Sequence, residues 1–316
     1  MKQVDFILGT MTFGESVFSP EAEKIVTAFL KEGYDKLDTA YVYNDGNSER
    51  ILGEILPSVG KTCKIATKVN PRITGKLDAD AAYFQVGESL KRLKLDCVDT
   101  VFLHFPDSVT PVEYVLQAMN DLYVQGKYKE LGLSNYPAWM VADIWHICDK
   151  KGWVKPTIYE GIYNPLTRKA EVELNDALNH FGMRFYAYNP LSGGLLTGRY
   201  GSFEETPTEG RFTHRPNYVG RYWKESFFDA LKVIDDASHK LGVTSVEAVY
   251  RWLAFHSMLN SERGDAIIIG VSKLDHLFQN MNAVKNGPLP GEMVEAFETA
   301  WAVSKKDSPE YFKLYR

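Results

Sequence analysis

The 316-residue sequence is poor in cysteine, in basic runs and in long apolar stretches. Its three cysteines, Cys63, Cys97 and Cys148, are far apart and form no Cys-x-x-Cys pair, which excludes a disulfide framework and a structural zinc site. Lysine and arginine number 36 against 41 acidic residues, so a nucleic acid or an anionic membrane surface is not expected as a partner. No window approaches the roughly 18 apolar residues of a membrane span, and the N-terminus lacks a secretory apolar core. We therefore expect a cytoplasmic protein.

Two common ligand motifs are absent as well. The seven histidines form no His-Glu-x-x-His pair, and the nearest metal-like spacing, His104-x-x-Asp107, is weak, so we predict no metal site. The Gly-x-Gly-x-x-Gly fingerprint of dinucleotide-binding folds is missing too. The glycine-rich segment 193–198 has the wrong spacing and by itself indicates a plain turn.

Short apolar runs instead alternate with amphipathic segments along nearly the whole chain, which is typical of parallel βα units. Because α/β barrels commonly reach about 200 to 400 residues as one domain, we predict a single-domain (β/α)8 TIM barrel over residues 1–316. A hydrophobic content of 45% is enough to fill its core. The eight predicted strands are residues 6–10, 36–39, 64–69, 98–104, 130–134, 157–162, 183–189 and 266–270.

Helix signals lie between these runs. Ser19 and Thr110 each precede a proline, so we predict that their hydroxyl groups cap helices. Helical spacing of apolar residues predicts further helices at 78–94, 136–151, 169–181, 225–241 and 244–256. Residues 195–224 are rich in Gly, Pro, Arg and aromatics without any period, which predicts a long irregular loop after the seventh strand, acting as a lid or binding loop.

Three consecutive predicted strands end on polar residues of catalytic type. Asp38 ends the second run, Lys68 lies at the end of the third and His104 ends the fourth, while Tyr43 follows Asp38 closely. The carboxyl ends of barrel strands meet at one mouth, where barrel enzymes carry out their chemistry. Taken singly, each residue has an ordinary structural explanation. Together they predict one pocket suited to delivering a proton to a carbonyl group.

These motifs resemble the catalytic tetrad of the aldo-keto reductases. The similarity rests on segments 38–43, 66–68 and 103–104 and continues through 132–135, 161–164 and 188–191, while 186–191, 193–198 and 221–225 are most similar to the aflatoxin-aldehyde and succinic-semialdehyde reductase branch. The resemblance implies reduction of aldehydes or ketones with NADPH as hydride donor. It implies Tyr43 as the general acid and His104 as the group that orients the carbonyl. Lys68, held by Asp38, would lower the pKa of the Tyr43 phenol.

The resemblance also implies a nicotinamide site. By position, Ser134 and Asn135 bind the carboxamide and Tyr188 stacks on the ring. The pyrophosphate and adenine contacts fall on Asn189, Leu191, Gly193, Gln279 and Asn280. Two positions depart from the family. Glu160 stands where glutamine is usual, which keeps an acceptor and loses a donor, and His276 stands where arginine or glutamine is common.

A phosphate site is predicted after the eighth strand. Ser272 is placed to cap a helix, whose free amides favour an anion, and Lys273 adds a positive charge, so we favour NADPH over NADH. Without the other motifs, the same residues would indicate an ordinary capped surface helix. The resemblance further implies a homodimer in some members, although nothing in the residues fixes assembly.

The substrate residues are predicted from aromatic character and position. Phe13, Phe105 and Trp223 would wall a pocket for hydrophobic carbonyls, and Arg221 resembles an arginine that this branch uses near its substrate. Arg199 and Arg215 are interpreted as solvated. The C-terminal tail, 311–316, is predicted to cover the barrel mouth and is longer and differently charged than the branch's usual ending.

Two other functions are compatible with a barrel that binds a nucleotide. One is a redox-sensing or regulatory subunit with little turnover, as the potassium-channel β subunits resemble reductases. The other is a barrel hydrolase or isomerase. The complete set of four catalytic-type residues favours turnover, because a sensor has no need of a general acid.

Overall fold

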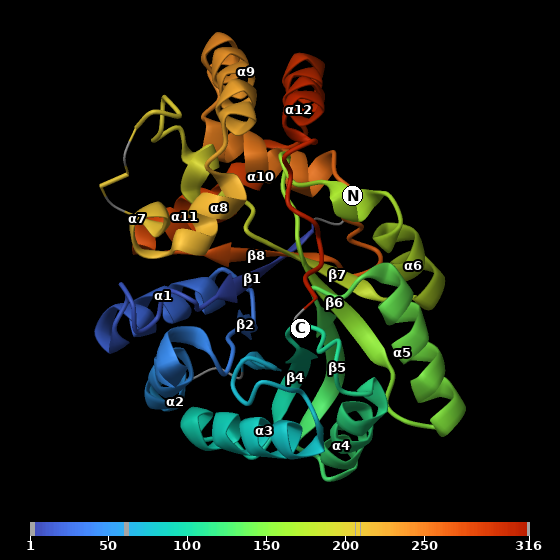
Figure 1. The fold of residues 1–316 in the computed structure, drawn as a ribbon. Coiled ribbons are helices and arrows are strands. Elements are labelled where there is room, and N and C mark those ends of the chain that lie inside the picture. The colour runs from blue at the N-terminus through green and yellow to red at the C-terminus, as the bar shows by residue number, and fades with distance from the viewer. Residues whose placement is uncertain (1–3, 60–62, 206, 209, 315–316) are drawn as a thin grey trace.

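Eight parallel strands close into a barrel in the order of the sequence, with β8 paired back to β1 (Figure 1). The computed structural model describes residues 4–59, 63–205, 207–208 and 210–314. The strands are β1 (Asp5–Gly9), β2 (Lys36–Asp38), β3 (Lys64–Val69), β4 (Val98–Leu103), β5 (Tyr128–Ser134), β6 (Pro156–Ile162), β7 (Arg184–Tyr188) and β8 (Ala266–Gly270). Each predicted strand lies within two residues of these bounds, and the (β/α)8 barrel is confirmed.

Helices surround the barrel between the strands (Figure 1). They are α1 (Ser19–Lys31), α2 (Asn47–Val59), α3 (Ala79–Leu93), α4 (Val112–Val124), α5 (Ala138–Lys151), α6 (Leu174–Phe181), α7 (Arg211–His214), α8 (Pro216–Tyr222), α9 (Glu225–Leu241), α10 (Ser245–Phe255), α11 (Leu274–Ala283) and α12 (Gly291–Ser304). Short 3-10 turns are η1 (Tyr43–Gly46), η2 (Lys169–Glu171), η3 (Ser192–Thr197) and η4 (Val284–Asn286). Within the described residues we find no helix with the length and apolar character needed to span a bilayer.

Strand alternation divides the apolar side chains between two cores. A large cluster lies between the strands and the helices, and a small one fills the barrel interior with Ile7, Phe102, Ile158, Tyr186, Ala266 and Ile268. Because side chains alternate along a strand, residues two positions further on point into the barrel above this small core. Lys68, His104 and Glu160 stand two residues after Ala66, Phe102 and Ile158, respectively. The fold therefore gathers these polar groups at the carboxyl ends of the strands.

Two predicted helix caps are wrong. Ser19 is the first residue of α1, Phe18 is the N-cap, and the serine hydroxyl donates to Glu54 Oε2 at 2.7 Å. For α4, the capping position is Pro111 and not Thr110. In α1 the fixed φ of Pro20 suits the first turn, whereas in α4 Pro111 is itself the N-cap, and neither helix has a side-chain cap. By contrast, the Thr244 hydroxyl caps α10 by accepting from Glu247 N at 3.2 Å.

The remaining helix predictions need smaller changes. The stretch 169–181 divides into η2 and α6, and the helix predicted from 136 begins at 138 because Pro137 is the extended residue before it. The predicted irregular loop contains α7 and α8, which are 4 and 7 residues long and thus too short to show a helical period.

The C-terminal tail returns to the barrel mouth, as predicted. Tyr311 is buried, donates its hydroxyl to Glu173 Oε1 at 2.6 Å and accepts from Ala138 N. Further on, the backbone N–H of Lys313 donates to the carbonyl of Asn135, directly after β5. The last two residues of the tail, 315–316, lie outside the described residues.

Two helical glycines give a matched test of how α2 is seated. A Cβ on Gly53 in α2 would lie 2.2 Å from the carbonyl oxygen of Arg92, whereas a Cβ on Gly87 in α3 would meet nothing within 4 Å. We expect Gly53→Ala to lower the free energy of unfolding by about 1–3 kcal/mol through overpacking. Gly87→Ala should raise it by about 0.5–1 kcal/mol because alanine restricts the unfolded chain. Urea denaturation of both variants checks this, and similar effects of the two would contradict the close helix contact.

Candidate active site

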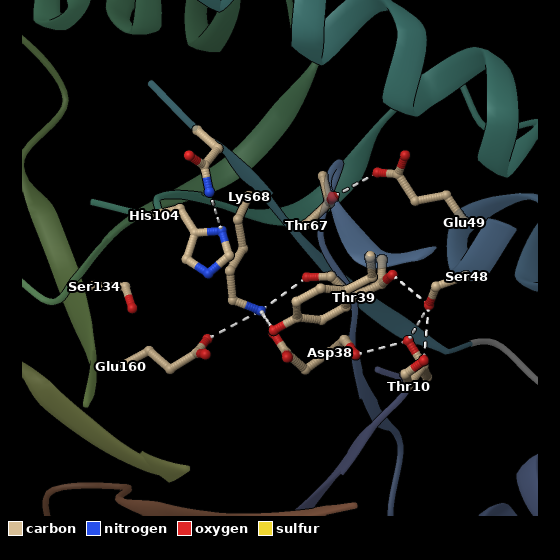
Figure 2. A network of polar contacts seen from close by, with 12 residues as sticks. Thr10, Asp38, Thr39, Ser48, Glu49, Thr67, Lys68, His104, Ser134 and Glu160 are labelled. Carbon is tan, nitrogen blue, oxygen red and sulfur yellow. Dashed lines mark hydrogen bonds and ion pairs between the residues drawn. The ribbon is translucent and has the colours of Figure 1, made fainter. Parts of the chain in front are cut away.

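The side chain of Lys68 is the centre of the polar cluster at the barrel mouth (Figure 2). It is fully buried, and its ammonium donates to Asp38 Oδ1 at 2.5 Å and to the carbonyl of Thr39 at 2.8 Å. The phenol oxygen of Tyr43 is 3.5 Å away. Burial disfavours the charge of Lys68, but its acidic neighbours, Asp38 above all, outweigh burial and raise its pKa. The ammonium is therefore charged.

Tyr43 reaches this ammonium from the loop after β2. The loop bends sharply, with Asn44 and Asp45 in the left-handed region at φ 52° and 55°. Asn44 is held by donating to the carbonyls of Met11 and Phe13. Asn and Asp are the residues that tolerate such angles best after glycine. Tyr43 is thereby fixed at the rim of the mouth.

The pKa of Tyr43 differs from the expected lowering. Burial raises it above the ordinary value, and the opposing effect of Lys68 is smaller. The expected lowering considered only the effect of the Lys68 charge on the pKa of Tyr43. It left out the loss of water around the phenol, which raises this pKa. Tyr43 is consequently a neutral phenol, which is the form that can give up a proton.

His104 presents a defined ring nitrogen to the mouth. Asn70 Oδ1 accepts from Arg72 N at 3.0 Å, so its Nδ2 faces His104 Nδ1 at 3.1 Å. An amide nitrogen only donates, so Nδ1 accepts and the ring proton is on Nε2. Burial, with smaller contributions from Lys68 and Arg72, holds the pKa of His104 well below 6.5. The imidazole is neutral and offers an Nε2–H donor.

Asn70 was missed by the sequence analysis. It stands two residues after Lys68, at the same strand end, and this position could have been noticed. Its second role is to anchor the loop after β3. Its backbone N–H donates to Gln85 Oε1, and its carbonyl accepts from Gln85 Nε2.

A hydroxyl network supports Asp38 from behind (Figure 2). The Thr10 hydroxyl donates to the carbonyl of Asp38 at 2.9 Å, and Ser48 donates to the carbonyl of Thr10 at 2.9 Å. Thr39 Oγ1 is 2.8 Å from Ser48 Oγ. The network joins β1, β2 and α2, and so fixes the strand end that carries Asp38.

A second buried ion pair lies on the outer side of β3. Glu49 in α2 is fully buried, accepts from the Thr67 hydroxyl at 2.6 Å and is 3.1 Å from Arg92 Nη1. Arg92 also donates to the carbonyl of Tyr41. Breaking a buried pair of this kind is costly because one charge is left uncompensated. The pair clamps the strand of Lys68 to α2 and α3.

The predicted nicotinamide contacts lie beside His104. Asn135, at φ 61°, donates to the His104 carbonyl and to Ser134 Oγ, both at 2.9 Å. Tyr188 donates to Asn135 Oδ1 at 2.6 Å. Glu160 is buried next to Lys68. The structure thus brings all four of these predicted residues to one side of the mouth, where Asn135 is already held by its neighbours.

The backbone after β7 forms a tight bend. Asn189, Ser192 and Gly193 have φ values of 56°, 50° and 73°, and Leu191 precedes the last two. The Ser192 hydroxyl is buried without a hydrogen-bond partner among the described residues. Two amides of the bend are bonded within it, because Ser192 N–H donates to the Asn189 carbonyl and Gly194 N–H to the Leu191 carbonyl. The unpaired hydroxyl is the feature that fits a phosphate-bearing cofactor.

The segment after β8 differs in one respect from the prediction. Lys273 is the capping residue of α11, with extended backbone, and Ser272 does not cap the helix. The Ser272 hydroxyl is instead 3.5 Å from His276 Nδ1. Ser272, Lys273 and Gln279 are exposed, His276 is partly buried and Asn280 is buried. The exposed residues leave the start of α11 open to a ligand.

Two predicted substrate residues pack against other side chains. Phe13 has no exposed surface and belongs to the large core. Trp223 packs among Tyr200, Phe212 and Phe228 with ring centroids 4.8–5.2 Å apart, and its indole donates to the carbonyl of Phe203. Aromatic character and position predicted both residues. Phe13 has no surface to offer a substrate, whereas Trp223 stays partly exposed while its ring packs in the loop after β7.

Phe105 and Arg221 do lie at the mouth. The Phe105 ring stacks on His104 at 4.7 Å, and the guanidinium of Arg72 is 5.2 Å from the Phe105 ring. Arg221 lies 5.5 Å from the Tyr218 ring, and its charge lowers the pKa of Arg72 together with the larger effect of burial. Arg72 therefore lies beside the histidine, and Arg221 is close enough to act on Arg72.

Arg215 is not the solvated residue that the sequence suggested. Its Nε donates to Glu15 Oε1 at 2.8 Å, and its Nη2 donates to Asn44 Oδ1 at 3.0 Å. These contacts join the loop after β7 to the loops after β1 and β2. The loop is thereby tied across the mouth, which agrees with its predicted covering role.

Two other cavities among the described residues lie away from the buried titratable cluster. One of about 390 Å³ lies between α3 and α4, and one of about 410 Å³ lies at the amino ends of the strands beside Asp5, Lys36 and Arg184. Among the described residues, no group of three or more His, Cys, Asp and Glu side chains is placed to hold a metal ion. We place the active site at the carboxyl ends because the buried titratable groups converge there.

Comparison with known proteins agrees with this geometry. The sequence model of the Aldo/keto reductase family matches residues 5–302. The chain is 44% identical to the rat protein Aflatoxin B1 aldehyde reductase member 2 over 97% of this chain and 87% of the relative. It is 43% identical to the human Aldo-keto reductase family 7 member A3, covering 97% and 96% of the two chains. The fold, the site and these similarities together show that the chain belongs to the aldo-keto reductase family.

Proposed function

We propose that this protein reduces an aldehyde or ketone to the alcohol with NADPH, and that Tyr43 supplies the proton. The observation that carries the proposal is the convergence of a phenol, an ammonium, a carboxylate and an imidazole at one mouth, from three strands and a loop. Membership of the family supports an oxidoreductase that acts on aldehydes. When bound, the nicotinamide supplies the hydride, which no side chain can provide.

Each side chain of the cluster has a separate role in the reduction. The carbonyl oxygen becomes negative as hydride arrives, so donors must already point at it. His104 offers Nε2–H to that oxygen, and the neutral phenol of Tyr43 gives it a proton. Lys68, 3.5 Å from the phenol oxygen, then stabilises the phenolate that is left. Asp38 keeps the ammonium charged and in place.

The cofactor site is proposed from residues that fit a dinucleotide. Ser134, Asn135, Glu160 and Tyr188 surround the nicotinamide position, and the bend from Asn189 to Gly193 suits the pyrophosphate. The 2′-phosphate is assigned to the start of α11, where Lys273 is exposed. His276, Gln279 and Asn280 on the same segment are assigned to the adenosine half. This assignment favours NADPH over NADH.

The proposed function extends to the substrate, the cellular location and the assembly of the protein. Phe105 and Arg221 at the mouth suit a carbonyl compound with an apolar part and an anionic or polar end. Aflatoxin B1 aldehyde reductase is the printed name of several relatives, which supports an aldehyde as substrate here. A cytoplasmic location is proposed from the sequence, whose three cysteines form no paired motif. A homodimer is part of the proposal only through the resemblance.

The phenol is tested by Tyr43→Phe. We expect kcat for 4-nitrobenzaldehyde reduction to fall by roughly 10²- to 10⁴-fold, because proton donation is lost while the ring remains. NADPH binding, followed by quenching of protein fluorescence, should stay unchanged. Wild-type turnover in this variant would contradict the general-acid assignment. A wild-type protein that binds NADPH and never turns over would favour the sensor hypothesis.

The support of His104 is tested by Asn70→Leu. Loss of the Nδ2 donor frees Nδ1 to take the ring proton, so fewer molecules present Nε2–H. We expect kcat to fall about tenfold, the equivalent of one lost hydrogen bond, with an unchanged Kd for NADPH. Steady-state kinetics and fluorescence titration measure the two quantities. An effect confined to cofactor binding would disprove this role.

The 2′-phosphate site is tested by Lys273→Ala. NADPH should bind about tenfold to a hundredfold more weakly, because a charge-assisted contact to phosphate is lost. NADH lacks that phosphate and should be affected little. Fluorescence titration with both cofactors compares the losses, and equal losses would place the 2′-phosphate elsewhere.

A further inference from the structure

The buried cluster at the mouth contains one cation and two carboxyl groups. Glu160 Oε2 is 3.3 Å from Lys68 Nζ, on the side of the ammonium away from Thr39 (Figure 2). Asp38 Oδ1 is closer to the same nitrogen, at 2.5 Å. The side chains of Asp38 and Glu160 are 5% and 4% exposed. With both carboxyl groups ionised, the site would hold a net negative charge almost without water.

In the part of the chain that the structure describes, no other cation relieves this excess among the groups that face Glu160. Those groups are Asp38 from β2, Tyr43 from η1, Lys68 from β3 and Tyr188 from β7. Only Lys68 among them is positively charged. An uncompensated buried charge is costly, so a carboxyl group in such a place binds a proton instead.

The contacts show which carboxyl group holds the proton. Asp38 has the shorter contact to Lys68, at 2.5 Å, whereas Glu160 Oε2 lies 3.3 Å from the same nitrogen. Burial, together with the charge of Asp38, raises the pKa of Glu160 well above 4.5. Burial raises the pKa of Asp38 too, but the attraction of Lys68 opposes this at close range. Asp38 is therefore the ionised partner.

We propose that Glu160 carries a proton in the resting protein and acts as a positioning residue beside the nicotinamide. This inference rests on the proposed function. A carboxylic acid donates from one oxygen and accepts at the other, so it reproduces both hydrogen-bonding roles of the glutamine usual at this position. Kept neutral, it also leaves the charge of Lys68 to Asp38 and to the phenol of Tyr43.

Ionisation of Glu160 would remove both benefits. The carboxylate can no longer donate to the carboxamide, and it competes with Tyr43 for the ammonium. The phenolate left after proton transfer is then less stable, and reduction slows. The protein consequently contains a built-in loss of activity at high pH that a glutamine would not give.

The proton itself is tested without any cofactor by comparing wild type with Glu160→Gln. The unfolded chain loses the Glu160 proton near its ordinary pKa of 4.5, while the folded chain keeps it. The wild-type folding equilibrium should therefore weaken relative to the variant as pH rises above that value, by up to about tenfold per pH unit. Urea denaturation from about pH 5 to about pH 8 measures the difference. A difference that is independent of pH would overturn the proposal.

Infrared spectroscopy provides a second measurement on the cofactor-free protein. At neutral pH, the spectrum of wild type minus Glu160→Gln should contain the carbonyl stretching band of an un-ionised carboxylic acid. A carboxylate band in its place would show that Glu160 is ionised and would end the proposal.

The consequence for catalysis is tested by the pH profile of kcat/KM. Wild-type kcat/KM should fall about tenfold per pH unit above the pKa of Glu160, whereas Glu160→Gln should lack this fall. The matched control is Glu130→Gln, the same substitution on the neighbouring strand β5, where Glu130 is 39% exposed and paired with Arg184. Its profile should follow wild type. Identical profiles for all three proteins would overturn the positioning role.

The outcomes separate this inference from the proposed function. If wild type reduces no carbonyl compound at any pH, the proposed function fails, while urea denaturation and infrared spectroscopy still report the Glu160 proton. If wild type is an active reductase and the two measurements find an ionised Glu160, only the present inference fails.

Discussion

A buried ammonium is the constraint on which the rest of this structure depends. Lys68 has no exposed surface, so its charge must be met by protein groups that arrive from other elements. Asp38 and the Thr39 carbonyl come from β2 and the residue after it, and Glu160 comes from β6. The requirement to solvate one charge thus fixes where three strand ends meet. It also places the neutral phenol of Tyr43 within reach of that charge.

Hydrogen bonds and an ion pair around the cluster hold these strand ends in place. The hydroxyls of Thr10 and Ser48 tie β1 and α2 to the backbone of β2, and the pair of Glu49 and Arg92 clamps β3 from outside. Such groups have no direct part in chemistry. They hold the reacting groups at fixed distances, and in a site of low dielectric this fixed geometry is the main source of electrostatic stabilisation.

The strand pattern and the tetrad could be predicted because both depend on local sequence. Eight apolar runs set the barrel, and a polar residue at the end of a run lies at the level of the mouth. The substrate residues could not be predicted in the same way. In the sequence, Phe13 and Trp223 are as suitable as Phe105 for lining a substrate pocket. In the structure only Phe105 stacks on His104, whereas the other two rings pack against other apolar side chains. Aromatic character does not reveal which neighbour a ring will contact.

The sequence by itself determined the order of the strands. It also determined the four candidate catalytic side chains and their common level in the barrel, because strand period and strand ends are local properties. Only the tertiary structure decided their protonation. Burial outweighs the effect of Lys68 on Tyr43, and Asn70 sets the tautomer of His104. Two carboxyl groups from distant strands share one ammonium. Protonation depends on the water and charge surrounding each group, and these are known only when remote segments have come together.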